Sequence, residues 1–285
     1  MSAPRAPIGV FDSGVGGLSV LRALRTSLPH EDFVYLGDTA RLPYGTKSPQ
    51  TVVRYSLQCA AKLVECKIRC LVVACNTASA SSLPALRQRY PELPVIGVIE
   101  PGAQAAVEAS VSQRIAVIGT EGTIQGGAYQ AAIQRLNPAA KVSSLACSLF
   151  VALAEEGWTQ GAIPEAVARR YLGALFGAIS GDAPDTSDVP DTLVLGCTHF
   201  PALAEPIRAV LPARVRIVDS AGTTAAAVLR QLTDAPRGAG AGTAPVTARG
   251  SVTLLATDSA ARFARVGSRF LGESLSADAI QVIDL

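Results

Sequence analysis

The chain of 285 residues predicts an α/β fold made of two similar units, each with a mostly parallel sheet. Short apolar, β-branched runs alternate with segments of helical periodicity, a pattern typical of parallel strands joined by helices. The order strand, glycine-bearing turn, helix opens the chain near residue 8 and returns near residue 114. Two apolar strands also end in cysteine, at Cys75 and Cys197. These three observations indicate a degenerate internal duplication.

The first unit begins with a strand, a tight glycine-rich turn at residues 12–17 and a helix that ends near Pro29. Its strands are expected at 8–11, 33–36, 71–74 and 95–99. Its other helices are expected at 48–66, where apolar residues recur at helical spacing, and from about 82 to 90. The pattern restarts after Glu100-Pro101-Gly102.

The remaining elements also alternate between strands and helices. Strands are expected at 114–119, 193–196, 215–218, 252–257 and 280–283. Helices are expected around 150–158 and 223–232, and at 163–179, 201–210 and 259–271. Polar residues at 180–188 predict a surface loop, and the Ala, Gly and Pro of 234–250 predict a mobile one.

Composition argues against several classes of protein. With a net charge of +2 and scattered basic residues, the chain has no electrostatic footprint for nucleic acid. Its longest apolar run, residues 171–179, is shorter than the roughly 20 residues that a membrane-spanning helix needs. The polar N-terminus lacks the apolar core of a signal peptide. Six cysteines in such a chain indicate reduced thiols, so we expect a cytoplasmic protein that binds no membrane.

Most of the cysteines are expected to be structural. Cys59, Cys66, Cys70 and Cys147 have no special position, and free cysteine commonly serves as a small buried apolar residue. The chain has two histidines and no closely spaced pair of cysteines, so we expect no metal site.

The turn after the first strand approaches a dinucleotide-binding fingerprint, but Ser19 stands where the third glycine belongs. Backbone N–H groups at the start of the next helix suit a small carboxylate equally well. The pair Asp12-Ser13 favours a functional turn over a plain structural one.

Cys75 and Cys197 differ from the other cysteines in position. Each ends an apolar strand and precedes a segment able to begin a helix, where a thiol pKa is lowered. Ligands bind at the carboxyl ends of parallel strands, so both thiols reach one cleft if the two units face each other. Inversion of a stereocentre needs a base on one face of a carbon and an acid on the other, and thiols serve both roles. The titratable groups that are candidates to assist them are Asp12, Asp38, Glu155, Glu156 and His199.

Five motifs lie in order between residues 11 and 201: Phe11-Asp12-Ser13-Gly14-Val15-Gly16-Gly17, Gly37-Asp38, Pro43-Tyr44-Gly45, Ala74-Cys75-Asn76-Thr77-Ala78 and Gly196-Cys197-Thr198-His199-Phe200-Pro201. Together they closely resemble the glutamate racemases of the aspartate/glutamate racemase family. The resemblance implies two pseudo-symmetric α/β domains, residues 1–101 plus 217–285 and residues 102–216, with the active site in the cleft between them. It also implies a homodimer that interconverts L- and D-glutamate without a cofactor and supplies D-glutamate for peptidoglycan.

The resemblance also implies roles for single residues. Cys75 would act on the α-proton of D-glutamate and Cys197 on that of L-glutamate. Asp12 and His199 would assist the respective thiols, with Asp38 and a nearby glutamate, for which we favour Glu155 over Glu156, as further helpers. Substrate contacts would come from Asp12, Ser13, Tyr44, Gly45, Asn76, Thr77, Thr198 and His199.

Other interpretations remain open. An aspartate racemase of the same family would differ only in pocket shape. A cysteine amidohydrolase would use one thiol with His199, but it leaves the other thiol without a role, and His199 is close in sequence to Cys197 for a base. A non-enzymatic binding protein for a small dicarboxylate explains the duplicated units but not the two thiols.

Overall fold

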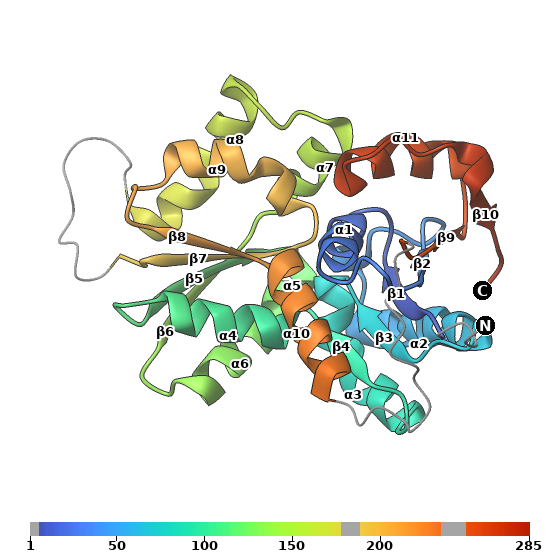
Figure 1. The fold of residues 1–285 in the computed structure, drawn as a ribbon. Coiled ribbons are helices and arrows are strands. Elements are labelled where there is room, and N and C mark those ends of the chain that lie inside the picture. The colour runs from blue at the N-terminus through green and yellow to red at the C-terminus, as the bar shows by residue number, and fades with distance from the viewer. Residues whose placement is uncertain (1–5, 178–188, 235–248) are drawn as a thin grey trace.

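The computed structural model describes residues 6–177, 189–234 and 249–285, and within them two sheets form two lobes (Figure 1). The first sheet has the strand order β10-β9-β2-β1-β3-β4, and the second has the order β6-β5-β7-β8. Every pairing is parallel. The predicted α/β fold with two mostly parallel sheets is confirmed. The predicted loop at 180–188 and most of the one at 234–250 lie outside the described residues.

The strands are short, and helices connect most of them. The strands are β1 (Ile8–Asp12), β2 (Phe33–Gly37), β3 (Cys70–Val73), β4 (Val95–Gly97), β5 (Arg114–Gly119), β6 (Lys141–Ala146), β7 (Thr192–Gly196), β8 (Arg216–Asp219), β9 (Val252–Ala256) and β10 (Ile280–Val282). The helices are α1 (Leu18–Ser27), α2 (Pro49–Glu65), α3 (Asn76–Arg89), α4 (Ile99–Ala109), α5 (Glu121–Gln125), α6 (Ala128–Leu136), α7 (Leu149–Glu156), α8 (Ala162–Phe176), α9 (Ala204–Val210), α10 (Ser220–Asp234) and α11 (Ala260–Leu271). Short 3₁₀ turns lie at Tyr44–Thr46, Phe200–Leu203 and Ala277–Ala279.

The two sheets repeat one topology. In the first, β2-β1-β3-β4 are neighbours in that order, and β6-β5-β7-β8 follow the same order in the second. Strand β3, which leads to Cys75, therefore corresponds to β7, which leads to Cys197. This correspondence confirms the pseudo-symmetry that the paired cysteine-ended strands predict.

The C-terminal strands extend the first sheet, because β9 pairs with β2 and β10 pairs with β9. Strand β8 pairs with β7 and so lies in the second sheet. The expected boundary between residues 216 and 217 therefore passes through β8. The division into domains at these residue numbers stays a prediction.

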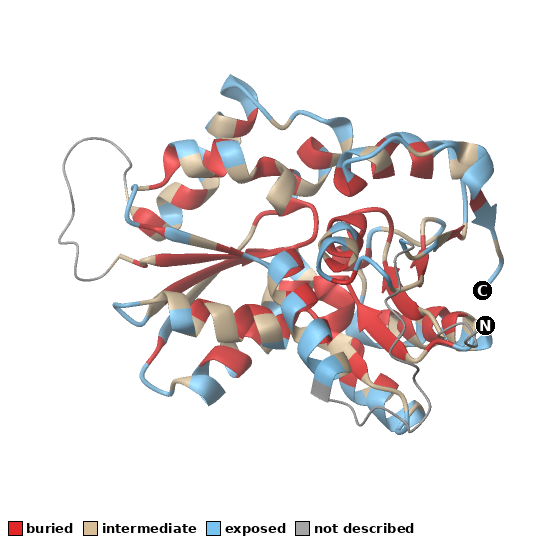
Figure 2. Cartoon of the chain, viewed as in Figure 1, coloured by how far each residue is buried: buried red, intermediate tan, exposed pale blue. Residues whose placement is uncertain are grey.

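Helices cover both faces of the sheets, which explains why central strands such as β1, β3 and β7 are apolar and buried throughout. All five residues of β1 are buried. Ile8 and Val10 pack into one core cluster and Phe11 into another, because successive side chains point to opposite faces. Figure 2 shows the buried strands inside helices whose outer sides are exposed. None of the described helices is long and apolar enough to cross a membrane.

Two predicted boundaries are wrong, and one strand was missed. Helix α3 begins at Asn76, not near 82, and continues through Pro84, which lacks only one backbone donor. Helix α4 begins at Ile99, which was expected to end a strand, and it includes Glu100-Pro101-Gly102. Proline is tolerated in the first turn of a helix because the N–H groups there have no intrahelical partner. Strand β6 was not predicted, since it lies at a sheet edge and is only partly buried.

Candidate active site

The turn after β1 holds Asp12 at the carboxyl end of the first sheet. The Asp12 side chain is fully buried, and its Oδ2 accepts a hydrogen bond from the Gly14 N–H at 2.9 Å. The Tyr35 hydroxyl donates to the Gly14 carbonyl at 3.0 Å and ties the turn to β2. Burial raises the pKa of Asp12, and the charge of His199 offsets part of that rise. Asp12 Oδ1 has no partner among the described residues.

Cys75 is the N-cap of α3. Its Sγ accepts a hydrogen bond from the Ala78 N–H at 3.5 Å and lies 3.6 Å from the Ser13 Oγ, toward which the thiol donates. Burial, and after it the Asp12 carboxyl, raises the pKa of Cys75 to about 12. As expected, the helix N-terminus lowers the pKa of Cys75 through the hydrogen bond from the Ala78 N–H, but burial has the larger effect. Cys75 is therefore a protonated thiol at neutral pH.

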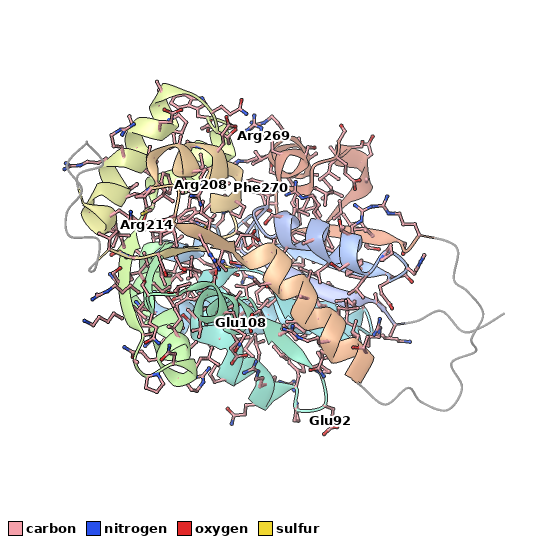
Figure 3. The ribbon with its side chains drawn as sticks, turned by 60° about the vertical axis from the view of Figure 1, so that its left-hand side comes forward. Glu92, Glu108, Arg208, Arg214, Arg269 and Phe270 are labelled. Carbon is pink, nitrogen blue, oxygen red and sulfur yellow. The ribbon has the colours of Figure 1, made fainter. Side chains whose placement is uncertain are left out.

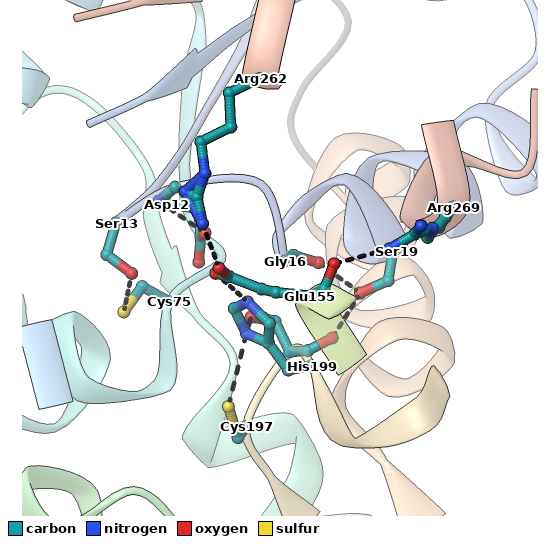
Figure 4. Close-up of polar contacts among 12 residues, drawn as sticks. Asp12, Ser13, Gly16, Ser19, Cys75, Glu155, Cys197, His199, Arg262 and Arg269 are labelled. Carbon is teal, nitrogen blue, oxygen red and sulfur yellow. Dashed lines mark hydrogen bonds and ion pairs between the residues drawn. The ribbon is translucent and has the colours of Figure 1, made fainter. Parts of the chain in front are cut away.

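Cys197 directly follows β7 and faces a chain of polar side chains (Figure 4). Its Sγ lies 3.7 Å from His199 Nδ1, and His199 Nε2 lies 3.2 Å from Glu155 Oε1. Glu155 Oε2 accepts a hydrogen bond from Arg262 at 2.8 Å. His199 contacts Cys197 although only one residue separates them in sequence. The backbone at His199 is already helical, with φ −80° and ψ −29°.

The environment of Cys197 differs in charge from that of Cys75. Burial favours the neutral form of His199, but its contacts with Cys197 and Glu155 outweigh burial and raise its pKa to about 10. The His199 contact in turn lowers the pKa of Glu155. At neutral pH an imidazolium therefore faces Cys197, and such a cation stabilises negative charge on the sulfur that it contacts.

Both thiols line one small cavity between the lobes. Its free space is about 40 Å³, room for about three water molecules. The lining comes from both lobes: Ser13, Pro43, Tyr44, Gly45, Cys75, Asn76, Thr77, Thr120, Thr123, Val151, Cys197, Thr198 and His199. The cavity brings together every predicted substrate contact except Asp12, which lies behind Ser13.

Asn76 presents a fixed donor at this cavity. Its Oδ1 accepts hydrogen bonds from the Tyr129 hydroxyl at 2.9 Å and the Ser220 hydroxyl at 3.4 Å. Its buried Nδ2 has no partner among the described residues. An unpaired buried donor is costly, so the amide is suited to an acceptor such as a carboxylate within the cavity.

Three threonine hydroxyls from both lobes meet at the cavity edge. Thr77 Oγ1 lies 2.9 Å from Thr120 Oγ1 and 3.2 Å from Thr123 Oγ1, and the last two are 3.0 Å apart. Thr120 and Thr123 are not among the site residues that the sequence predicts. The duplication held a signal for them, because they follow β5, the counterpart of β1 and its Asp12 turn.

Asp38 lies behind the cavity instead of at the thiols. Its carboxylate accepts hydrogen bonds from Arg41 Nε at 2.7 and 3.0 Å, from Thr257 at 3.0 Å and from the Tyr44 hydroxyl. Tyr44 lines the cavity. This placement favours a role for Asp38 in positioning Tyr44 over a role in proton transfer.

The two neighbouring glutamates lie in different surroundings: Glu155 contacts His199, whereas Glu156 is exposed.

Burial raises the pKa of Cys59, Cys70 and Cys147 to about 12, in keeping with structural thiols. Within residues 6–177, 189–234 and 249–285 no group of three or more His, Cys, Asp or Glu side chains could hold a metal ion.

Comparison with known proteins gives consistent matches. A family model described as Asp/Glu/hydantoin racemase matches residues 8–228. The glutamate racemase of Geobacter metallireducens is 50% identical over 279 residues, which are 98% of this chain and 97% of that protein. The solved structure of the Thermus thermophilus glutamate racemase in complex with β-chloro-D-alanine has 40% identity and a TM-score of 0.81, over 100% of this chain and 99% of that one. The Francisella tularensis glutamate racemase in complex with D-glutamate has 33% identity and a TM-score of 0.84, over 98% and 97%.

Proposed function

The chain belongs to the Asp/Glu/hydantoin racemase family, and from this premise we propose that it interconverts L- and D-glutamate by proton transfer between Cys75 and Cys197. The observation that carries the proposal is the placement of two thiols in one cavity, at equivalent strand ends of two related sheets. The product D-glutamate is used for peptidoglycan, as the enzyme class implies.

The two thiols have different surroundings, and a two-thiol mechanism needs one sulfur as the base and the other as the acid. In the L-to-D direction, the Cys197 sulfur takes the α-proton from one face of the carbon. Cys75 then gives its proton to the other face, so one C–H bond breaks and one forms. Cys75 ends as the thiolate and Cys197 as the thiol, which is the starting state for the reverse direction. The His199 imidazolium stabilises the charge on Cys197.

The cavity offers groups for the substrate as well as for the proton. Asn76 Nδ2 and the hydroxyls of Thr77, Thr120 and Thr123 supply donors for carboxylates. The weakly acidic α-proton requires a transition state stabilised by fixed dipoles in a site shielded from water. We propose that these residues and the two thiols suffice without a cofactor.

A racemisation assay tests the function. Purified protein without added pyridoxal phosphate or metal is expected to erase the optical rotation of L-glutamate. In deuterated water the D-glutamate formed should carry deuterium at the α-carbon, while the remaining L-glutamate stays unlabelled early in the reaction. Retained rotation under reducing conditions would contradict the proposal, and early label in both enantiomers would point to a single base.

Substitution of each thiol tests the mechanism. Cys75→Ala and Cys197→Ala are each expected to lower kcat by about 10²- to 10⁴-fold, since each removes a general acid or base. Cys66→Ala is the matched control because Cys66 lies outside the cavity lining and its thiol donates to the Lys62 carbonyl of the preceding helix. Racemisation that persists in each of the two single variants would contradict the two-thiol mechanism.

Two alternatives are tested by the same preparation. L-aspartate as a better substrate than L-glutamate would make the protein an aspartate racemase. The contact of His199 with Cys197 would also fit a cysteine amidohydrolase, but that activity leaves Cys75 unexplained. We further propose a homodimer in the cytoplasm, which size-exclusion chromatography and cell fractionation test.

A further inference from the structure

Helix α11 carries the first lobe across to the Cys197 side of the cavity. Arg262 and Arg269 are two turns apart on this helix, and both bind Glu155 of α7. Arg262 donates to the Glu155 carboxylate, and Arg269 donates to the Glu155 backbone carbonyl at 2.6 Å. Figure 1 shows α11 ending beside α7, and Figure 3 shows Arg269 and Phe270 where the helix meets the second lobe.

The contact is built into the packing around it. The Phe270 ring packs edge-on against the His199 ring, with 5.0 Å between centroids, and Phe270 is buried. Helix α7 ends at Gly157, which has φ +79°, a conformation that favours glycine. A Cβ at Gly157 would lie 2.7 Å from the Arg269 guanidinium, so the glycine also leaves room for that arginine.

The two oxygens of Glu155 have different partners. Oε1 faces His199 Nε2, and Oε2 accepts from Arg262 (Figure 4). With both oxygens engaged, the plane of the carboxylate and the tilt of the imidazole ring are fixed together. Loss of Arg262 would free the carboxylate to rotate away from His199.

On the basis of the proposed racemase function, we propose that Arg262 is a positioning residue for Cys197, which acts by holding Glu155 against His199 when the lobes are closed. The contacts described for Cys75 involve a different set of residues, Ser13 and Ala78, with Asp12 nearby. Arg262 therefore supports one of the two proton transfers and leaves the other unsupported. Opening of the cleft would separate α11 from α7 and break the contact between Arg262 and Glu155.

This asymmetry gives a readout that a general structural defect would not produce. L- and D-glutamate have equal free energy in water, so any variant must lower kcat/KM equally in both directions. The primary deuterium isotope effects need not change together. If the Cys197 step slows, removal of deuterium from L-glutamate becomes more rate-limiting, and removal of deuterium from D-glutamate becomes less so.

The experiment compares Arg262→Ala with Arg265→Ala, using L- and D-glutamate with and without α-deuterium. Arg265 lies on the same helix, is exposed and makes no hydrogen bond or ion pair within the described part of the chain. Arg262→Ala should lower kcat/KM by about 10- to 100-fold, as misplaced catalytic groups do. It should also raise the isotope effect on kcat/KM for L-glutamate and lower that for D-glutamate. Arg265→Ala should leave kcat/KM and the isotope effect unchanged for both L- and D-glutamate. Arg262→Lys should restore part of the kcat/KM that Arg262→Ala loses.

A double variant tests the route through Glu155. Arg262→Ala combined with Glu155→Gln should be no slower than Glu155→Gln alone, because the arginine acts through that carboxylate. Additive losses, equal rates for Arg262→Ala and Arg265→Ala, or a lower rate with unchanged isotope effects would each overturn the proposal. An inactive wild-type protein would instead overturn the proposed function itself.

Discussion

At the scale of single residues, the protonation of His199 distinguishes the Cys197 side of the cavity from the Cys75 side. His199 is buried, yet its contacts with Cys197 and Glu155 raise its pKa from 6.5 to about 10. A buried cation of this kind is retained only where partners compensate for its desolvation. The contacts of His199 with Cys197 and Glu155 therefore also couple folding to the binding of a proton.

This coupling predicts a pH dependence of stability. Between about pH 6.5 and 10 the folded protein holds the His199 proton and the unfolded chain does not. The resulting stabilisation is fully present below pH 6.5 and is lost as the pH rises through about 10. Urea unfolding between pH 6 and 10 should show a steeper loss of stability for the wild type than for His199→Gln. Parallel curves for the two proteins would contradict the raised pKa.

At the scale of elements, Cys75 has two separable duties. It caps α3 through the Ala78 N–H, and it lines the cavity as a thiol. The cap is a property of the helix, since serine or cysteine can accept that hydrogen bond and alanine cannot. In the proposed mechanism, proton transfer requires the thiol itself.

Two substitutions at Cys75 separate these duties. Cys75→Ser should retain the cap, whereas Cys75→Ala should lose it and have a free energy of unfolding lower than that of Cys75→Ser by about 1 kcal/mol. Both should lose racemase activity. Denaturant unfolding and the racemisation assay measure the two effects on the same proteins. Equal stability of the serine and alanine variants would show that the cap contributes nothing.

At the scale of the whole molecule, the two lobes meet around the cavity that both thiols line. The free space is about 40 Å³. Gly45 of the first lobe packs against Thr120 of the second so closely that a Cβ at Gly45 would lie 2.7 Å from the Thr120 Cβ. We predict that the lobes separate when substrate enters and that this contact forms again for catalysis.

Gly45→Ala should hold the lobes apart. The added methyl group is expected to raise the KM for glutamate and to speed the alkylation of the cavity thiols, which saturating glutamate slows in the wild type. Gly173→Ala is the control, because a Cβ there has no neighbour within 4 Å. Peptide mapping after iodoacetamide treatment locates the alkylated cysteines. Unchanged KM and alkylation in Gly45→Ala would argue against closure at this contact.

The sequence by itself determined the α/β class, the duplication and most of the strands, because continuous apolar runs and turn residues are local properties of the chain. It also placed Cys75 and Cys197 in matched positions, through the strands that precede them. The resemblance to glutamate racemases added the expected catalytic and substrate-binding roles of single residues, which a hydrophobic pattern does not contain. Local pattern placed the start of α3 too late and missed the start of α4 at Ile99, because Pro and Gly residues read locally as the punctuation of turns.

Tertiary structure alone decided which groups meet. Glu155 and Arg262 are 107 residues apart in sequence, and nothing in the surface of a predicted helix distinguishes Arg262 from Arg265. Distant segments also place Asp38 behind Tyr44. They bury Cys75 as well, and this burial raises the pKa of its thiol more than the helix N-terminus lowers it. Charge and proton affinity respond to desolvation and to neighbours within a few ångströms. Those neighbours exist only after the two lobes have folded and closed.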